Sequence, residues 1–300
     1  MNYLKLSLKI LVSFGLISYL IFTFDFSKSW EVILKSNTYY FLISFVFIIL
    51  NYVFSAIRWK FLVLSDQKLT LWFYIKLYFI GSFFNNFLPT SIGGDAYKIL
   101  LLGEKIDSKT DAFTATFLER FLGMIALLVF SLYGLFSYNN VDLSTFILGF
   151  FFVIAGFFGF LIFYPKFRIN HTLFNKIFSI IDKIHDSFMR YKNFPQVILF
   201  SLISSFIVQF FSIMSQYVLF LAIGFNVPLD YAFFAFPIIF LSGYAIPSLN
   251  GIGSQDFLYQ KFFNNIGIVS ETVLAASVLY HLARFLVSLI GGIFYIIEKK

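Results

Sequence analysis

The chain has 300 residues, of which 60% are hydrophobic and only 12% are charged, and it contains no cysteine. An average soluble domain carries about twice that charged fraction, so the composition indicates a polytopic membrane protein. The lack of cysteine excludes disulfides, thiolate nucleophiles and cysteine-bound metal sites. The net charge of +7 does not indicate a nucleic-acid partner, because the basic residues lie in loops between apolar spans, where they orient a membrane protein.

Six apolar runs are long enough to cross a bilayer, which takes about 20 residues of α-helix. In chain order they cover residues 6–24, 39–57, 112–138, 143–164, 196–223 and 272–297. The first run has no small-residue cleavage site after it, so we expect a retained anchor rather than a signal peptide. A polar link is expected over 25–37, and Arg58-Trp59-Lys60 after the second run is typical of an interfacial anchor.

An interrupted apolar element covers residues 71–103, between the second and third spans. Pro89, Gly93, Gly94 and Asp95 follow closely on one another within this otherwise apolar stretch. A helix cannot run straight through them, because proline removes a backbone donor and paired glycines favour a loop. We therefore expect two half-helices that meet at membrane depth. The N-terminus of the second half-helix would face a cavity and could bind an anion there.

The same pattern returns near the C-terminal end, over residues 229–265. Pro247, Gly251, Gly253 and Asp256 repeat the order proline, glycine, glycine, acid. Three predicted crossings separate the two interrupted elements. Hairpins that enter and leave by one side would therefore dip into the membrane from opposite faces, as in the inverted repeats of many transporters.

The two halves resemble one unit used twice, over about 39–138 and about 195–297. Each interrupted element follows a long apolar span and precedes one that carries an arginine, Arg120 or Arg284. The sequence therefore predicts a single all-α membrane domain with six transmembrane helices and two re-entrant hairpins. The alternative is that Pro89 and Pro247 merely kink helices that cross the membrane.

The basic segment 165–195 differs in composition from the spans around it. Its apolar residues recur at helical spacing, which predicts an amphipathic helix on the membrane surface, with a helix that docks a partner protein as the alternative. These residues are Leu173, Ile177, Ile180, Ile181, Ile184 and Phe188. With six spans, most of the 22 lysines and arginines fall on the side of this segment, which predicts that both termini are cytoplasmic.

Glu119, Arg120 and Arg284 fall inside predicted spans. Each charge costs about 2.5–3.5 kcal/mol to insert, so we expect these side chains to face a cavity or one another. The functional interpretation is a cationic midplane pocket for a phosphate-bearing head group, since guanidinium binds phosphate through two hydrogen bonds. The structural interpretation is a salt bridge from Glu119 or Asp95 to an arginine, which would simply hold the bundle together.

The predicted site combines the residues of the two breaks with the charged residues near them. The substrate-binding candidates are Arg120, Arg284, Lys98, Asn86, Gly93, Gly94, Gly251 and Gly253. The candidates for charge balance or proton uptake are Asp95, Glu119 and Asp256. Lys98 would guide head groups in or extend to the interface, and His281 would make a hydrogen bond inside the bundle. Asn85, Asn86 and Asn250 are expected mainly to cap freed backbone.

No catalytic residue, metal site or cofactor is predicted. The sequence contains no phosphate-binding loop, no serine-hydrolase elbow and no zinc-hydrolase motif, and the three histidines lie far apart. We therefore expect a protein that is not an enzyme, with membrane lipids as its partners.

Four motifs occur in order along nearly the whole chain. They are Asn86-Phe-Leu-Pro-Thr-Ser-Ile-Gly-Gly-Asp-Ala-Tyr-Lys98, Leu118-Glu-Arg-Phe-Leu-Gly123, Pro247-Ser-Leu-Asn-Gly-Ile-Gly-Ser-Gln-Asp256, and Arg284 with Gly291-Gly292. In these motifs the chain resembles the lysylphosphatidylglycerol synthase transmembrane family. The resemblance implies a flippase-like module of the bacterial inner membrane with re-entrant helices. Lys98 stands where the family commonly has arginine and Asp256 where it has glutamate, so both charges are kept.

The first functional hypothesis is translocation of an anionic phospholipid or polyprenyl-phosphate-linked lipid between leaflets. The alternatives are an enzyme of lipid or glycolipid modification that uses Asp95 or Glu119 as base, and a membrane subunit that recruits a cytoplasmic enzyme through residues 165–195. A homo-oligomer is compatible with each of them. The sequence shows no soluble aminoacyl-transferase domain, so lysyl transfer is not expected.

Overall fold

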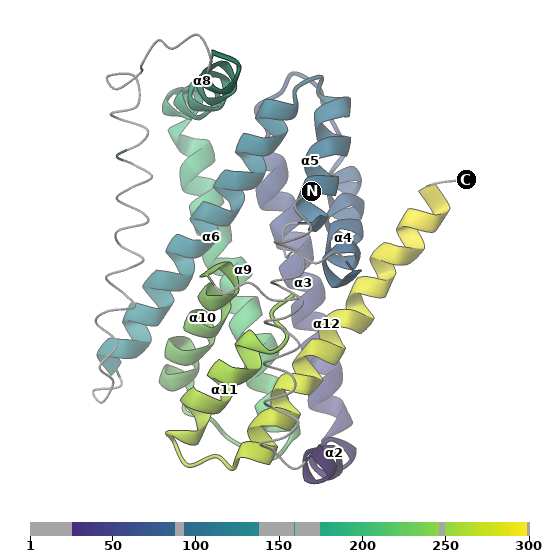
Figure 1. Cartoon of the computed structure of the whole chain (residues 1–300), viewed down its shortest axis with the longest axis vertical. Helices are drawn as coiled ribbons and strands as arrows, with labels where there is room; N and C mark the ends of the chain where they lie inside the picture. Colours follow the sequence, from purple (N-terminus) through teal and green to yellow (C-terminus); the bar gives the residue numbers. More distant parts are fainter. Residues whose placement is uncertain (1–25, 88–92, 138–158, 160–174, 246–249, 299–300) are drawn as a thin grey trace.

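The computed structural model describes residues 26–87, 93–137, 159, 175–245 and 250–298. Every regular element in this part of the chain is helical (Figure 1). The elements are α2 (Phe26–Leu34), α3 (Thr38–Leu62), α4 (Leu71–Phe87), α5 (Gly93–Lys105), α6 (Lys109–Ser137), α8 (Asn175–Arg190), the short 3-10 helix η3 (Tyr191–Asn193), α9 (Pro195–Ala222), α10 (Leu229–Ala245), α11 (Ser254–Asn264) and α12 (Ser270–Glu298).

Four helices, α3, α6, α9 and α12, are long and apolar enough to cross a membrane, with 25 to 29 residues each. They correspond to the predicted spans at 39–57, 112–138, 196–223 and 272–297. The prediction of an all-helical, multi-pass membrane protein is therefore confirmed. The predicted spans at 6–24 and 143–164 lie outside the described residues.

Two pairs of shorter helices stand where the interrupted elements were predicted. Residues 88–92 separate α4 from α5, and residues 246–253 separate α10 from α11. In Figure 1, α4 and α5 occupy the upper half of the molecule, and α10 and α11 the lower half. The broken ends meet in the middle, where Asn250 Nδ2 donates to Asn86 Oδ1 at 2.6 Å. The two prolines of the predicted breaks, Pro89 and Pro247, lie outside the described residues.

The long helices pack around the shorter pairs, with α3 along α9, α10 against α6 and α4 against α12. The last contact is very close, because a Cβ at Gly291 would lie 1.9 Å from the carbonyl oxygen of Phe79. A Cβ at Gly94 of α5 would lie equally close to the carbonyl oxygen of Gly81 of α4. Small residues permit such backbone contacts between membrane helices. Glycines therefore hold α4 tightly between α5 and α12.

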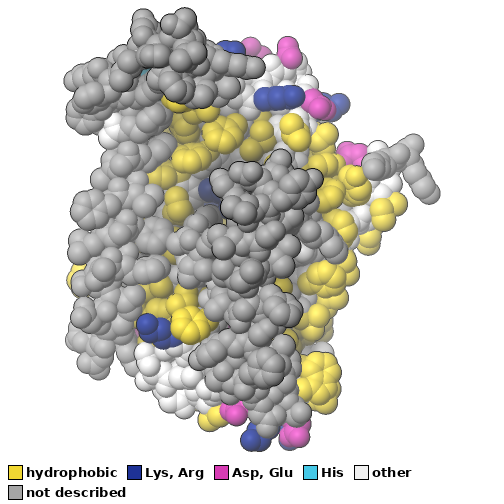
Figure 2. All heavy atoms as spheres, in the orientation of Figure 1, with side chains coloured by type: hydrophobic (Ala, Val, Ile, Leu, Met, Phe, Trp, Pro, Cys, Tyr) yellow, Lys and Arg dark blue, Asp and Glu magenta, His cyan; other side chains and the backbone are white. Residues whose placement is uncertain are grey.

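Where Figure 2 shows described residues, large apolar side chains form much of the surface, and charged side chains lie mostly near the two ends. The long helices contribute exposed residues such as Leu199 and Ile203 of α9 and Ile293 and Ile296 of α12. Lipid tails solvate such a surface at no cost, whereas the ends face water and head groups. The outside of the bundle thus has the character of a membrane protein, and its polar groups are turned inward.

The predicted polar link over 25–37 is wrong, because residues 26–34 form helix α2. This helix packs on α12, where Ile33 contacts a buried cluster on α9 and α12, while Trp30 remains exposed. Its mixture of charged and apolar residues suits a short interfacial helix. Such an element contains no long apolar run.

The predicted interfacial anchor Arg58-Trp59-Lys60 is also wrong. Arg58 is 4% exposed and Trp59 is fully buried, and only Lys60 faces outward. Trp59 Nε1 donates to Thr116 Oγ1 of α6 at 3.1 Å. Because α3 continues to Leu62, the end of the apolar run falls inside the bundle rather than at its edge.

The helix predicted within residues 165–195 is present as α8. Ile184 and Phe188 on its apolar side pack into a cluster formed with α3, α4 and α6, and Tyr191 donates to the carbonyl of Leu62. Leu173, at the start of the predicted pattern, lies outside the described residues. Part of the apolar face of α8 therefore contacts the bundle rather than a membrane surface.

Candidate functional site

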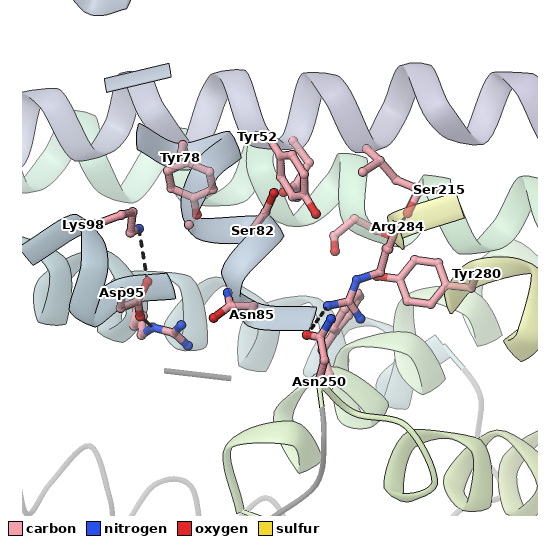
Figure 3. Close-up of a pocket in the computed structure, with 16 residues that line it drawn as sticks. Tyr52, Tyr78, Ser82, Asn85, Asp95, Lys98, Ser215, Asn250, Tyr280 and Arg284 are labelled. Carbon is pink, nitrogen blue, oxygen red and sulfur yellow. Dashed lines mark hydrogen bonds and ion pairs between the residues drawn. The ribbon is translucent and has the colours of Figure 1, made fainter. Parts of the chain in front are cut away.

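A polar cavity lies in the middle of the bundle, where the broken ends of the two interrupted elements meet (Figure 3). It has two overlapping lobes of about 170 and 220 Å³, walled by α3, α4, α5, α6, α9, α10, α11 and α12. The residues shared by both lobes include Asn85, Asp95, Lys98, Arg120, Asn250 and Arg284. In the sequence, four of them stand in or near the two breaks and the two arginines stand in the spans that follow, and the structure brings all six together.

The cavity lies near the mid-length of two long helices. Arg120 belongs to α6 and Arg284 to α12, and each helix has 29 residues. At 1.5 Å per residue such a helix is about 43 Å long, and Arg284 lies roughly 21 Å from either end. The hydrocarbon core of a bilayer is about 30 Å thick. If α12 crosses a membrane, Arg284 therefore lies deep within the hydrocarbon core.

One side of the cavity holds a continuous series of ion pairs. Arg58 Nη2 donates to Glu119 Oε1 at 3.1 Å. Lys98 Nζ lies 3.3 Å from Glu119 Oε2 and 3.2 Å from Asp95 Oδ1. Arg120 Nε completes the series by donating to Asp95 Oδ2. Three cations thus share two carboxylates. On this side of the cavity, the charged residues form salt bridges that hold the bundle together, as the structural interpretation predicts.

Lys98 is held inside the protein, so the predicted extension to the interface is wrong. Its side chain is buried, and Nζ lies 4.2 Å from the centre of the Tyr78 ring and 4.8 Å from that of Trp59. Aromatic faces attract a cation more strongly when it is removed from water. Together with the two carboxylates, these rings hold the ammonium group between α3, α4, α5 and α6.

Arg284 lies on the opposite side of Asn85 from Lys98 (Figure 3). Its Nη2 donates to Asn250 Oδ1 at 2.8 Å, and its guanidinium lies 5.3 Å from the centre of the Tyr280 ring. Its Nη1 is buried without a hydrogen-bond partner, and within the described part of the chain no carboxylate pairs with it. At a partly buried cation with an unused donor, an anion gains a strong, charge-assisted hydrogen bond.

Asparagines connect the two interrupted elements to each other. Asn86 accepts from Asn250 and donates through Nδ2 to Ser288 Oγ of α12 at 2.6 Å. Asn85 Oδ1 accepts the N–H of Gly94 at 2.8 Å and so caps the start of α5. The expected capping role is seen for Asn85, whereas Asn86 and Asn250 form a bridge between the two halves.

At the two helix starts where an anion site was predicted, two backbone N–H groups already donate to acceptors within the protein. Gly94 donates to Asn85, and Gly253 donates to Asp256 Oδ2 at 2.8 Å. Gly93 and Gly94 are buried at the start of α5, while Gly251 lines the larger lobe. Gly251 and Gly253 have φ values of 89° and 86°, a conformation that favours glycine. Cationic side chains, rather than these two amides, are the donors that face the cavity.

Asp256 lies outside the wall of the cavity. Besides accepting from Gly253, its carboxylate contacts His281 Nε2 at 2.9 Å, which joins α11 to α12. His281 therefore makes the bundle hydrogen bond expected for it. Across the described ranges, no three histidine or acidic side chains gather into a candidate metal site.

Several residues of the cavity wall are absent from the predicted site. They include Arg58, Asn51, Ser55, Tyr78 and Gln255. Arg58 was assigned to the interface because it closes an apolar run. The signal that identifies it is spacing, since Asn51, Ser55 and Arg58 recur four and three residues apart and so share one face of α3. A polar stripe on an apolar helix indicates a face turned toward a cavity.

Comparison with curated proteins finds no match. The family model described as lysylphosphatidylglycerol synthase TM region matches residues 6–292, which include every residue named above in the cavity wall. The chain therefore belongs to the lysylphosphatidylglycerol synthase transmembrane-region family.

Proposed function

We propose that this protein moves an anionic, phosphate-bearing phospholipid or polyprenyl-phosphate-linked lipid between the leaflets of the bacterial inner membrane. The observation that carries the proposal is the polar cavity in the middle of the bundle, with Arg120 and Arg284 in its wall. A charged head group cannot cross hydrocarbon without large cost unless polar groups receive it. The family description, which names the membrane region of a lipid synthase, supports a lipid as the substrate.

In this proposal the chain crosses the membrane six times, and α4–α5 and α10–α11 are re-entrant hairpins of an inverted repeat. Helices α5 and α11 have 13 and 11 residues. Such helices extend only about 20 and 16 Å, which is too short for a hydrocarbon core of about 30 Å. The placement of the two pairs in opposite halves of Figure 1 supports entry from opposite faces.

Both termini are proposed to be cytoplasmic. Helix α8 and the turn between α5 and α6 lie at one end of the molecule, and α2 and the turn between α11 and α12 lie at the other (Figure 1). The elements at the first end carry Lys60, Lys68, Lys105, Lys109, Lys183, Arg190 and Lys192. Those at the second end carry Lys28, Lys35 and Lys261. The excess of positive charge favours the α8 end as the cytoplasmic one.

We propose no enzymatic step. Asp95 and Glu119, the two carboxylates that could act as a base, each already accept from two cationic side chains. A general base needs a free position for the proton that it removes. The ion pairs therefore favour a site through which a lipid head group passes rather than a site that catalyses a reaction.

A membrane subunit that recruits a cytoplasmic enzyme is the second candidate. A hollow of about 900 Å³ between α8 and the turn from α5 to α6 favours it, because charged side chains of both signs line this surface, among them Glu104, Asp107, Lys183 and Arg190. Such a mixed polar surface suits a water-soluble partner better than a lipid.

Reconstitution into vesicles that contain fluorescent lipids tests the first proposal. We expect the protein to move labelled anionic phospholipid between leaflets, and both Arg120→Ala and Arg284→Ala to abolish this movement. Lys60→Ala, at an exposed position on α3, serves as the control and should leave it unchanged. Absence of movement for every anionic lipid would refute transport, and co-purification of a soluble enzyme through α8 would then favour the second candidate.

A further inference from the structure

The side chains that line the polar cavity do not balance in charge. Four basic and two acidic residues of the described chain line it, namely Arg58, Lys98, Arg120, Arg284, Asp95 and Glu119. They leave an excess of two positive charges. The segments within the two breaks, 88–92 and 246–249, contain no ionisable residue in the sequence, so they do not change the balance.

One of the two excess charges lies in the ion-pair series, where three cations share two carboxylates, and the other is Arg284. Asp95 and Glu119 are engaged by Arg58, Lys98 and Arg120 on one side of the cavity. Arg284 shares neither carboxylate, and its Nη1 is buried without a partner. Asp256, the acid of the second interrupted element, does not line the cavity, because it is bound to Gly253 and His281.

Uncompensated charge inside an apolar bundle is costly, so a ligand that neutralises it is favoured over one that does not. A phosphate diester brings one negative charge and leaves one positive charge unbalanced. A zwitterionic head group leaves two positive charges unbalanced. An aminoacylated head group with net positive charge increases the number of unbalanced positive charges. A phosphate monoester or diphosphate brings about two negative charges near neutral pH and removes the excess.

The donors around the cavity fit the same class of ligand. A monoester has three terminal oxygens, one more than a diester, and each accepts strong hydrogen bonds from cations. Arg284 lines both lobes and its Nη1 makes no hydrogen bond, and Asn51, whose Nδ2 donates one of its two hydrogens to the carbonyl oxygen of Val208, stands in the same wall. The additional oxygen therefore has donors available to it.

From this charge balance we infer that the cavity selects a lipid head group with two or more negative charges, a phosphate monoester or a diphosphate, over monoanionic, zwitterionic and cationic head groups. The inference rests on the proposed function and names the class of substrate for it.

Lipid binding to the purified full-length protein, measured by native mass spectrometry, tests the inference. The probes are phosphatidic acid, phosphatidylglycerol and phosphatidylcholine with identical acyl chains, together with a polyprenyl diphosphate. We expect phosphatidic acid and the diphosphate lipid to be retained at least tenfold more than phosphatidylglycerol. Equal retention of phosphatidic acid and phosphatidylglycerol would overturn the inference.

Variants then locate the selectivity. Arg284→Gln should lower the retention of phosphatidic acid about tenfold, to the level of phosphatidylglycerol, and Arg284→Lys should restore part of it. Lys60→Gln, at an exposed position on α3 outside the cavity, is the control. If Arg284→Gln reduces the thermal stability of the protein, Arg120→Gln is used instead, because it also removes one positive charge from the cavity wall. Unchanged selectivity in both variants would overturn the inference.

Two further measurements separate the possible outcomes. Excess inorganic diphosphate should displace the bound lipid if the phosphate group is recognised, and a failure to displace it would overturn head-group recognition. In the vesicle assay, selective binding without movement between leaflets would refute the proposed transport and leave the inference intact. Equal movement of phosphatidic acid and phosphatidylglycerol would support transport and refute selectivity.

Discussion

The two interrupted elements share one sequence plan, yet their acidic residues have different tasks. In the first, Asp95 lines the cavity and pairs with Lys98 and Arg120. In the second, Asp256 turns away from the cavity, accepts the N–H of Gly253 and contacts His281. The two carboxylates of the first half therefore pair with all three of its cations, whereas the second half leaves Arg284 without a carboxylate partner among the described residues.

This difference shows that a repeated motif does not imply repeated chemistry. The ion pairs of the first half join α3, α5 and α6 and so stabilise the wall of the cavity. The second half contributes the cation that is open to a ligand. A variant that unbalances the first half should therefore affect folding, and a variant that balances the second half should affect binding.

The largest effect is expected for Glu119→Gln. Glu119 is 1% exposed and is the shared partner of Arg58 and Lys98. Removing one member of a buried ion-pair network leaves uncompensated charge and costs about 3–5 kcal/mol. We expect a large loss of thermal stability in detergent, measured by the unfolding midpoint. A double variant, Arg58→Met with Glu119→Leu, removes opposite charges together and should lose less stability than Glu119→Gln alone.

A smaller effect is expected for Gly94→Ala. The new methyl group would lie 1.9 Å from the carbonyl oxygen of Gly81, so α4 and α5 would have to separate, and overpacking of this kind costs about 1–3 kcal/mol. In the second half, a Cβ at Gly243 would meet only the flexible amide of Gln255 at 3.2 Å. Gly243→Ala should therefore leave the unfolding midpoint nearly unchanged. Equal losses in the two variants would show that the first helix pair is no more tightly packed than the second.

The sequence predicts the architecture well because apolar length and helix breakers act locally. The four spans that the structure describes, the two interruptions and the central charges Asp95, Glu119, Arg120 and Arg284 can be read without coordinates. The helix α2 could not be recognised in the same way, because its stability depends on packing against α12 rather than on an apolar run.

Side-chain partners are harder to predict than spans. Arg58 looked like the end of a membrane span, and only the neighbouring helix α6, 61 residues further along the chain at Glu119, explains its burial. The different roles of Asp95 and Asp256 are likewise invisible in the motif. They depend on which side chain of another helix, Lys98 and Arg120 or His281, approaches each carboxylate.

Asn250→Asp should make the second half resemble the first. The new carboxylate would lie beside Arg284, which now donates to Asn250 Oδ1 at 2.8 Å. An internal carboxylate then competes with the ligand for the arginine, and we expect about tenfold weaker binding of phosphatidic acid, close to 1.4 kcal/mol. Asn264→Asp, at the exposed end of α11, adds the same charge away from the cavity and should leave binding unchanged. Weaker binding in both variants would point to overall charge rather than to Arg284.

The smallest effect is expected for Arg190→Gln, which breaks the ion pair between α8 and α6. Arg190 donates to Asp111, but its side chain is 47% exposed, and exposed pairs contribute about 0–1 kcal/mol because water and salt screen them. The apolar contacts of Phe188 and the hydrogen bond of Tyr191 to Leu62 keep α8 in place without it. We therefore expect the unfolding midpoint to fall only slightly, and less at high salt than at low salt. A loss as large as that of Glu119→Gln would mean that the charges at the surface, and not those of the cavity, hold the first half together.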